Sequence, residues 1–456
     1  MNYSVLVDGV EVENGMVDLP AIAPDKSESV VLPYVTTAEA GKETLLLLNV
    51  CLKEATSWCE AGYSIASEQY SLRARSSSLP TVDNSVGENL EIDDTSSSYR
   101  VTIKNNQTEI VFGSTGNLIS WTFEGKPMIE QQKGPEYANY RWIENDKYED
   151  TANGVSGRTM TCKRSSDGRN VIVTVNGSGN KCPYKFIYTI YPTGQMDLKA
   201  QYTPATSGLR RIGLQMCFPA GYENVEYYAR GPWENYIDRK TGSYLGRYTT
   251  TVSDMFEPYP HPQSMGNRED LRDLTLTNPE TGYGIKVETS GTVAFSLLHH
   301  DDKEFASYAL HPWDLVPADC TYAHFDYMQR GLGNGSCGQN TETISKYHCP
   351  SSGTYTYTLR FSPLNPTSTS IAVLPEALSD VLIVHNAAAQ QLVCSGELEA
   401  GTEISLYNMG GVKLATANNV VPTSSVSLST QGLPCGAYIV VLKNDTGSRT
   451  HKFLKR

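Results

Sequence analysis

The chain has 456 residues, of which 39% are hydrophobic and 19% are charged, as is ordinary for a protein that buries apolar cores. Its length suggests roughly three domains at about 150 residues each. The formal net charge is −13, and no block of Lys and Arg marks a basic face, which argues against nucleic acid as a partner. No apolar run reaches the roughly 18 residues of a membrane span, so we expect no transmembrane segment.

Apolar and polar residues alternate along most of the chain, which is the pattern of strands with one buried face. Clear examples are residues 5–7, 45–50, 99–103, 171–175, 355–359 and 404–406. Turn pairs such as Asp8-Gly9 and Gly410-Gly411 separate them. Long windows of helical period with caps are nearly absent. The sequence therefore predicts an all-β protein.

Two polar stretches divide the chain. The first, residues 75–84, is rich in Ser and Pro, and a second short polar segment follows it at 95–98. The other, residues 362–370, is rich in Pro, Ser and Thr. Such stretches bury too little apolar surface to pack. The predicted organisation is a sandwich at 1–75, a linker at 76–95, a large domain at 96–362, a linker at 363–375 and a C-terminal module at 376–456. The first residues already have the pattern expected for the middle of a strand, so the first sandwich is expected to be partial.

The roles of the Cys and Tyr residues each have two interpretations. The ten cysteines contain no Cys-x-x-Cys pair, which argues against zinc ribbons and redox motifs. Buried free thiols are the first expectation, and pairing in an oxidising compartment, for instance Cys394 with Cys435, is the alternative. The 28 tyrosines suit half-buried strands and also sugar-contacting surfaces.

The segment 231–239 combines a Gly-Pro turn, a Trp and two carboxylates beside Arg239. Glu234 and Asp238 would suit acid/base work if they were held about 5–10 Å apart across a glycosidic bond. They are close in sequence, however, and Arg239 is an obvious structural partner. A hydrogen-bonded loop anchor is therefore the favoured interpretation.

The run His299-His300-Asp301-Asp302 has residue types that bind metals. Adjacent residues on a strand point to opposite faces, so one ion cannot easily use them all, and we predict no metal site.

Residues 331–338 form a glycine-rich segment that lacks the Lys-Ser/Thr and helix of a phosphate-binding loop. It is either a mobile loop tip at a site or a tight connection. Cys337, without an assigned His and acid partner, is weak evidence for a nucleophile.

Several segments, in family order, resemble the large β-galactosidases of glycoside hydrolase family 2. Residues 57–69 resemble the end of the family's fourth domain, and residues 139–146 resemble the Arg-x-x-x-Asn-Asp segment early in the fifth. Residues 231–239 and 253–263 closely match the most recognisable stretch of that fifth domain, and residues 328–337 resemble its C-terminal loop.

The resemblance implies a partial immunoglobulin-like sandwich followed by a large β-supersandwich similar to galactose mutarotase. In the family, the glycine-rich loop reaches over the active site and contributes to the sugar platform. This role falls on Asn334, Ser336 and Cys337 as substrate-binding residues. Some members carry a Trp at the position of Cys337, and a Cys cannot offer that flat apolar face, so sugar affinity or specificity there is expected to differ.

The family's two catalytic glutamates and main magnesium ligands lie on a TIM barrel that no residue of this chain matches. We therefore expect no catalytic residue and no cofactor here, with magnesium in the barrel. The interpretation is the non-catalytic C-terminal part of a retaining β-galactosidase. Its expected partners are a β-galactoside and a barrel-bearing chain or upstream region, with homo-oligomeric assembly as a further role. The alternatives are a separate small subunit that completes another chain's active site, and a surface carbohydrate-binding module.

The C-terminal module carries a second resemblance. Residues 404–414 alternate around Gly410-Gly411, and residues 428–440 lead to a basic end at 451–456. This pattern resembles the C-terminal sorting domain of the type IX secretion system of Bacteroidetes, which implies a secreted or cell-surface protein. The alternative is a small fibronectin-like sandwich. Because residues 1–5 show no export signal, we expect missing upstream sequence.

Overall fold

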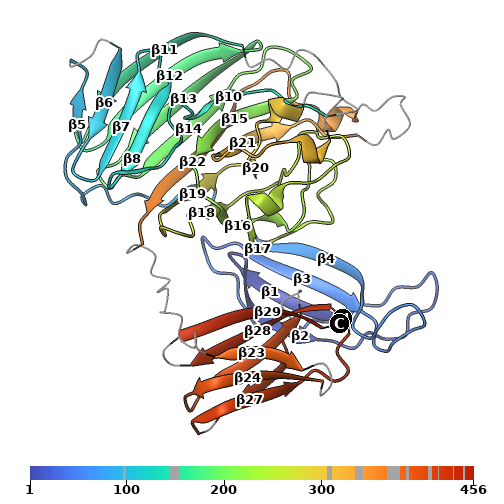
Figure 1. Ribbon diagram of the computed structural model, residues 1–456. Helices are drawn as coiled ribbons and strands as arrows, with labels where there is room; N and C mark the ends of the chain where they lie inside the picture. Colours follow the sequence, from blue (N-terminus) through green and yellow to red (C-terminus); the bar gives the residue numbers. More distant parts are fainter. Residues whose placement is uncertain are drawn as a thin grey trace. The chain divides into compact units, whose positions relative to one another are not determined.

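The computed structural model describes residues 1–95, 99–143, 154–305, 311–333, 343–366, 381–386, 390–408, 413–419, 421–434, 436–444 and 447–455. Across these residues the regular elements are strands and four short 3-10 helices, which confirms the all-β prediction (Figure 1). No helix in them is long and apolar enough to cross a lipid bilayer. The chain forms two compact units, split between residues 366 and 367, and each is described by itself.

The elements of the first unit are β1 (Asn2–Val7), β2 (Val10–Met16), β3 (Thr44–Cys51), β4 (Ser64–Arg73), β5 (Glu91–Asp93), β6 (Arg100–Lys104), β7 (Thr108–Gly113), β8 (Leu118–Phe123), β9 (Lys126–Pro127), β10 (Glu136–Ala138), β11 (Val155–Arg164), β12 (Val171–Gly179), β13 (Cys182–Ile190), β14 (Met196–Tyr202), β15 (Arg211–Phe218), β16 (Asn224–Gly231), β17 (Tyr244–Thr251), η1 (Ser253–Met255), β18 (Asp273–Thr277), β19 (Gly284–Ser290), β20 (Ala294–Leu298), η2 (Asp302–Phe305), η3 (Pro312–Asp314), β21 (Thr321–Gln329), η4 (Ser345–Tyr347) and β22 (Tyr355–Leu364). The elements of the second unit are β23 (Leu382–Asn386), β24 (Gln391–Leu398), β25 (Glu403–Asn408), β26 (Lys413–Asn418), β27 (Thr423–Ser429), β28 (Gly436–Asn444) and β29 (Gly447–Lys455).

The N-terminal sheet has the order β2-β1-β3-β4 and is antiparallel throughout. Strands β1 and β2 form a hairpin whose two turn residues, Asp8 and Gly9, have φ of 48° and 79°. Positive φ at both positions is what a two-residue turn between twisted strands requires. The strand at 5–7 and the Asp8-Gly9 turn are therefore confirmed.

Three further sheets build the large domain. A nine-stranded sheet runs β11-β12-β13-β14-β22-β19-β18-β16-β17, a five-stranded sheet runs β5-β6-β7-β8-β9, and a four-stranded sheet runs β10-β15-β21-β20. Strand β13 alternates buried and accessible residues, as expected for a strand with one covered face. Strand β20 is buried at every position, so the four-stranded sheet is covered on both faces there. One apolar core joins all three sheets.

Tyrosines fill much of this core. Tyr137, Tyr188, Tyr202, Tyr227 and Tyr357 are each at most 1% exposed. The hydroxyl of Tyr357 donates to the carbonyl oxygen of Phe325, on a strand of another sheet, at 2.6 Å, and the hydroxyls of Tyr202 and Tyr357 lie 3.1 Å apart. Burying the ring while satisfying the hydroxyl, as at Tyr202 and Tyr357, suits the interior of a sheet sandwich. These residues favour the structural interpretation of the high tyrosine count.

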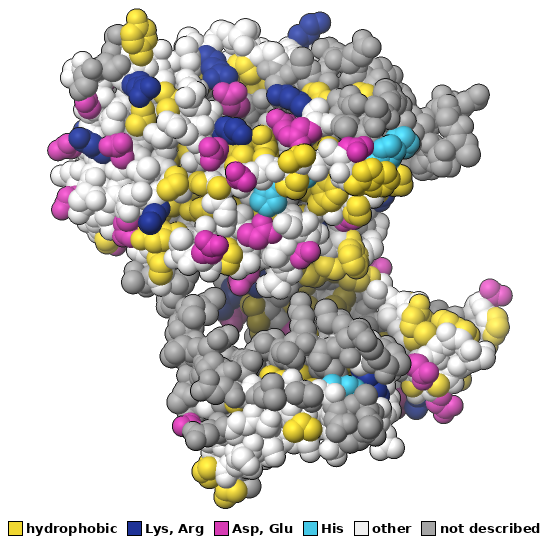
Figure 2. All heavy atoms as spheres, viewed as in Figure 1, with side chains coloured by type: hydrophobic (Ala, Val, Ile, Leu, Met, Phe, Trp, Pro, Cys, Tyr) yellow, Lys and Arg dark blue, Asp and Glu magenta, His cyan; other side chains and the backbone are white. Residues whose placement is uncertain are grey.

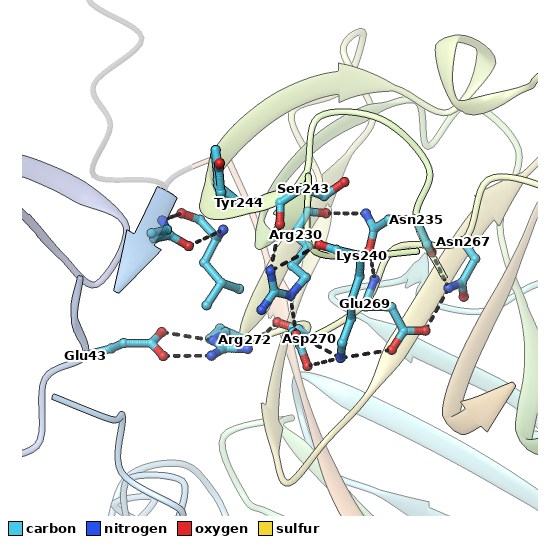
Figure 3. Close-up of polar contacts among 12 residues, drawn as sticks. Glu43, Arg230, Asn235, Lys240, Ser243, Tyr244, Asn267, Glu269, Asp270 and Arg272 are labelled. Atoms are coloured by element: carbon cyan, nitrogen blue, oxygen red, sulfur yellow. Dashed lines mark hydrogen bonds and ion pairs between the residues drawn. The ribbon is translucent and has the colours of Figure 1, made fainter. Parts of the chain in front are cut away.

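Glu43 joins the N-terminal sheet to the large domain (Figure 3). Its side chain is 4% exposed. It accepts hydrogen bonds from Arg272 Nε at 2.9 Å, from Arg272 Nη2 at 2.7 Å and from the hydroxyl of Tyr228 at 2.5 Å. Burial acts to raise the pKa of Glu43, but the hydrogen bonds and charge of Arg272 outweigh it, so the pKa is lowered. The carboxylate therefore stays ionised and paired.

Edge strand β4 is attached to β17 through side chains. The amide of Gln69 donates to the carbonyl oxygen of Leu245 at 2.8 Å and accepts from its N–H at 2.9 Å. The hydroxyls of Ser67 and Tyr244 lie 2.8 Å apart. These contacts satisfy backbone groups that an edge strand leaves open.

The two predicted linkers contain some strand structure. Residues 76–90 carry no strand, whereas β5 (Glu91–Asp93) joins the five-stranded sheet, and β22 continues to Leu364. The described cysteines Cys51, Cys59, Cys162, Cys182, Cys217, Cys320 and Cys349 are free thiols. Cys435 lies outside the described residues, so the pairing with Cys394 stays a prediction.

The second unit is a sandwich of two sheets, ordered β23-β24-β27 and β26-β25-β28-β29, around its own apolar core. Lys455 belongs to the basic end singled out in the sequence, yet it is only 7% exposed. Its Nζ donates to the carbonyl oxygens of Thr430 and Leu433, both at 2.7 Å. Lys455 therefore has a structural role. The turn at Gly410-Gly411 lies outside the described residues.

Replacing Glu43 with Ala removes the acceptor for Arg272 and Tyr228 and leaves the guanidinium, whose side chain is 17% exposed, without its carboxylate. Loss of one partner from a largely buried pair costs about 3 kcal/mol. We expect a drop of that size in the free energy of unfolding of the first unit, measured by urea titration. Asp18→Ala, which breaks an exposed pair with Lys53, should leave the midpoint unchanged. Equal midpoints for the two variants would contradict the role of Glu43.

Candidate functional site

Three loops meet at the C-terminal end of β21. They are the segment 231–239 after β16, the segment 264–269 before β18, and the start of the glycine-rich loop at 331–333. The N–H of Asn235 donates to the carbonyl oxygen of Asn267 at 2.7 Å, and Gln329 Nε2 donates to Asn267 Oδ1 at 2.8 Å. This junction is the candidate site.

Asp238 holds the start of the glycine-rich loop. Its Oδ2 accepts from the N–H of Gly333 at 2.9 Å. A Cβ on Gly331 would lie 2.7 Å from Asp238 Cγ and 2.8 Å from Thr343 Oγ1, so this position has no room for a side chain. Gly333 has φ of 76°, in the left-handed region that favours glycine. Two of the loop's glycines are thus explained by backbone conformation and close approach.

The predicted substrate-binding residues Asn334, Ser336 and Cys337 follow directly but lie outside the described residues. Their assignment stays a prediction. The structure places the beginning of their loop against Asp238, one of the two carboxylates of the segment that the sequence predicted to be a hydrogen-bonded loop anchor.

Glu234 is an anchor of the 231–239 loop. Its side chain is 7% exposed and accepts from Arg239 Nη2 at 2.7 Å, from the N–H of Gly266 at 2.9 Å and from the hydroxyl of Tyr236 at 3.2 Å. The hydroxyl of Tyr259 is a fourth donor. Four donors on one carboxylate confirm the loop-anchor interpretation.

A buried arginine lies beneath the junction. Arg211 begins β15, is 2% exposed, and its Nη1 donates to Asp302 Oδ2 at 2.9 Å. Its Nε lies 3.0 Å from Asp326 Oδ2, and its Nη1 lies 2.9 Å from Nδ1 of His324. Gly213 must lack a side chain because the carboxylate of Asp326 occupies that space. We call Arg211, Asp302, His324 and Asp326 the Arg211 cluster.

Electrostatics in the Arg211 cluster follow from burial. Burial raises the pKa of Asp326 to about 7, although the charge of Arg211 opposes the shift. Burial also raises the pKa of Asp302. The pKa of His324 is lowered by burial and by Arg211, so this imidazole stays neutral. One guanidinium thus serves two carboxylates, one of which takes up a proton near neutral pH. Because all four residues are nearly inaccessible, the cluster is structural.

The residues of the His-His-Asp-Asp run turn to different partners. His299 Nε2 lies 2.7 Å from Glu223 Oε2, and His300 Nδ1 lies 3.2 Å from Glu304 Oε2. Asp302 belongs to the Arg211 cluster. Within the described ranges, no group of three or more His, Cys, Asp and Glu side chains could hold a metal ion.

A polar network leads from the junction toward the N-terminal sheet (Figure 3). Asn267 Nδ2 donates to Glu269 Oε1 at 3.1 Å, Lys240 Nζ lies 3.6 Å from Glu269 Oε2, and the same Nζ donates to Asp270 Oδ2 at 3.2 Å. Burial raises the pKa of Glu269 to about 6, and Lys240 opposes the shift. Asp270 also accepts from Arg230 Nε at 2.5 Å and lies two residues before Arg272.

Sequence reasoning missed this network. The feature of the sequence that could have indicated it is the charged run Arg268-Glu269-Asp270, followed by Arg272. Figure 2 shows Lys and Arg side chains scattered among Asp and Glu on the face of the first unit drawn there, without a basic block.

Comparison with known families gives two matches. A family model described as "Beta galactosidase small chain" matches residues 104–361, and one described as "Beta-galactosidase, domain 4" matches residues 1–73. The first of these covers more than half of the chain.

Curated relatives of the chain carry the name β-galactosidase. The chain is 27% identical to a β-galactosidase of Priestia megaterium over 361 residues, covering 75% of this chain and 34% of the relative. It is 34% identical to that of Staphylococcus xylosus over 147 residues, covering 32% of this chain and 14% of the relative. It is 23% identical to a β-galactosidase of Vibrio vulnificus over 394 residues, covering 80% of this chain and 36% of the relative. At most, the chain spans about a third of the length of these relatives.

Among solved structures, one described as a putative aldose 1-epimerase from Escherichia coli K12 covers 60% of this chain and 99% of its own length. Its identity is 12% and its TM-score 0.35, too low to carry an argument about chemistry.

Asp326 makes the stability of the first unit depend on pH. An Asp has a pKa of about 3.9 in an unfolded chain, and Asp326 has a pKa of about 7 when folded. The folded protein therefore binds more protons between these values, and its free energy of unfolding falls as pH rises from about 4 to 7, by up to about 1.4 kcal/mol per pH unit. Asp326→Asn should flatten this slope in urea titrations at pH 5, 6 and 7, whereas Asp254→Asn, an exposed control, should not. Parallel slopes for all three proteins would contradict the assignment.

Asp238→Ala should free the start of the glycine-rich loop. Loss of one hydrogen bond worth about 1 kcal/mol corresponds to roughly fivefold faster amide exchange at Gly333. Hydrogen–deuterium exchange of a peptide covering Gly333 measures this, with Asp254→Ala as the control. Unchanged exchange in Asp238→Ala would show that the carboxylate does not hold the loop.

Proposed function

Because the chain belongs to the β-galactosidase small chain family, we propose that it is the accessory C-terminal part of a retaining β-galactosidase and supplies no catalytic residue. The observation that carries this proposal is the pair of adjacent family matches, 1–73 and 104–361, within about a third of the length of the relatives. The complete enzyme would hydrolyse terminal β-galactosides.

The carboxylates around the candidate site support a non-catalytic role. A retaining glycosidase needs two carboxyl groups about 5–5.5 Å apart that face the sugar, one as nucleophile and one as acid/base. Glu234 is occupied by four donors, and Asp302 and Asp326 are buried against Arg211. None of the three is presented to a substrate. In this proposal both catalytic acids, and the magnesium ion, belong to a TIM barrel outside this sequence.

The contribution of this chain is to complete the sugar pocket. Asn334, Ser336 and Cys337 would contact the galactoside from the glycine-rich loop. Support comes from the anchoring of the loop's first residues, where Gly333 donates to Asp238 and the carbonyl oxygen of Arg330 accepts from Arg141. A loop held at its base can present a few polar side chains with little loss of entropy on binding.

The barrel would come either from the same polypeptide or from a separate chain, and this region would also take part in homo-oligomeric assembly. The firm attachment of the N-terminal sheet through Glu43 and Gln69 supports a preformed platform for the barrel in either arrangement.

We further propose that the second unit is a sorting domain, which would place the protein outside the cell or at its surface. Residues 381–455 support this with a two-sheet sandwich that has its own core, as a detachable address domain requires. The resemblance of residues 428–456 remains the main argument.

The purified chain should release no nitrophenol from o-nitrophenyl β-galactoside, and addition of a barrel-bearing β-galactosidase chain that lacks this region should produce hydrolysis. The reason is that the two required acids are supplied only by the barrel. Turnover by the isolated chain that Glu234→Gln abolishes would overturn the proposal.

A further inference from the structure

Trp313 is exposed to solvent and has a parallel aromatic ring behind it. It lies in the 3-10 turn η3 between β20 and β21, and its side chain is 77% exposed. Its indole ring stacks on the imidazole of His311, with centroids 4.6 Å apart and an interplanar angle of 5°. An isolated exposed apolar side chain is ordinary, whereas one stacked in parallel on a neighbouring ring offers a single free flat face.

The support behind Trp313 is itself held by hydrogen bonds. Asp314 Oδ2 accepts from the backbone N–H of His311 at 2.9 Å and lies 3.1 Å from its Nδ1. The N–H of Asp314 donates back to the carbonyl oxygen of His311 at 3.0 Å. Pro312 fixes the backbone between the two rings. These hydrogen bonds order the turn and the imidazole on which the indole stacks, so less conformational entropy is lost when a ligand binds.

The surroundings of the ring identify the ligand class. The imidazole covers one face of the indole, so its exposed fraction comes from the other face and the edge. Asp314 Oδ2 lies 3.1 Å from Nδ1 of His311, so the carboxylate lies at the edge of the imidazole that backs the indole, with Oδ1 as a second acceptor oxygen. A flat apolar face beside a hydroxyl acceptor matches a pyranose ring, which has an apolar C–H face and a hydroxyl edge. The hydrogen bonds from His311 lower the pKa of Asp314, so the acceptor remains ionised.

We propose that Trp313, backed by His311 and bordered by Asp314, is a stacking platform that binds one sugar unit of an extended β-galactoside. The choice of a galactoside rests on the proposed function. A neutral sugar suits this acidic chain, whose net charge of −13 does not repel it. The half-exposed polar side chains of His311 and Asp314 beside the indole also differ from the dry apolar surround of a protein–protein hot spot.

The chain offers a matched control. Trp58 is 65% exposed, but it meets Tyr63 edge-on, with centroids 5.4 Å apart and an interplanar angle of 79°. It therefore has similar accessibility without a parallel ring behind it.

The test is affinity electrophoresis of the full chain, without any barrel chain, in gels that contain soluble β-1,4-galactan or, as a control, dextran. Wild-type protein should be retarded by galactan. Trp313→Ala should weaken binding by about tenfold or more, the size expected for a stacked Trp at the centre of a site. Trp313→Phe should keep part of the affinity, His311→Ala should lose part of it, and Trp58→Ala should stay within about twofold of wild type.

Two outcomes would overturn the platform: galactan affinity of Trp313→Ala equal to that of wild type, or an effect of Trp313→Ala confined to self-association in sedimentation experiments. Because no barrel chain is present, either result leaves the hydrolysis test of the proposed function untouched. Conversely, the hydrolysis test could fail while galactan binding persists and depends on Trp313. That result would overturn the proposed function and leave the sugar platform standing.

Discussion

The ion pair of Arg211 with Asp326 is the interaction around which the junction of loops is organised. It forms between the first residue of β15 and the sixth residue of β21, and it requires a glycine at 213 to make room for the carboxylate. A buried charge without a partner costs several kcal/mol, so β15, β21 and η2 are held in one arrangement by a single guanidinium. The glycine-rich loop leaves from the end of this fixed strand.

The same principle recurs toward the N-terminal sheet. Arg272 holds Glu43, and Lys240 with Arg230 holds Asp270, so the carboxylates along this path are neutralised by cations of the same chain. Carboxylates used in this way stabilise a scaffold and are not free to attack a sugar or to exchange protons with it. The carboxylates of this path and of the Arg211 cluster thus serve the scaffold.

Local patterns in the sequence predicted much of the fold. Alternation located strands such as β12 and β22, and Asp8-Gly9 marked a hairpin, because both features depend only on neighbouring residues. The proximity of Glu234 to Arg239 likewise indicated the loop anchor.

The contacts that sequence reasoning missed join distant residues. Glu43 and Arg272 are 229 positions apart, and Arg211 and Asp302 are 91 apart, so no local pattern links them. The His-His-Asp-Asp run has residue types that bind metals, and the sequence predicted that one ion could not use them all. It could not predict the separate partners that these side chains have, Glu223, Glu304 and Arg211, because all but Glu304 lie far away in the chain. The backing of Trp313 by His311 was equally hidden, since a stacked pair at i and i+2 requires the conformation of the turn.

The most direct measurement uses a mechanism-based inactivator, a 2-deoxy-2-fluoro-β-galactosyl fluoride, on an active mixture of this chain with a barrel-bearing chain. A retaining enzyme accumulates the covalent glycosyl-enzyme, and digestion followed by mass spectrometry locates it. The label should be found on a glutamate of the barrel, with every carboxylate of this chain unmodified. A fluorogalactosyl group on Glu234, or on any other carboxylate of these 456 residues, would contradict the account.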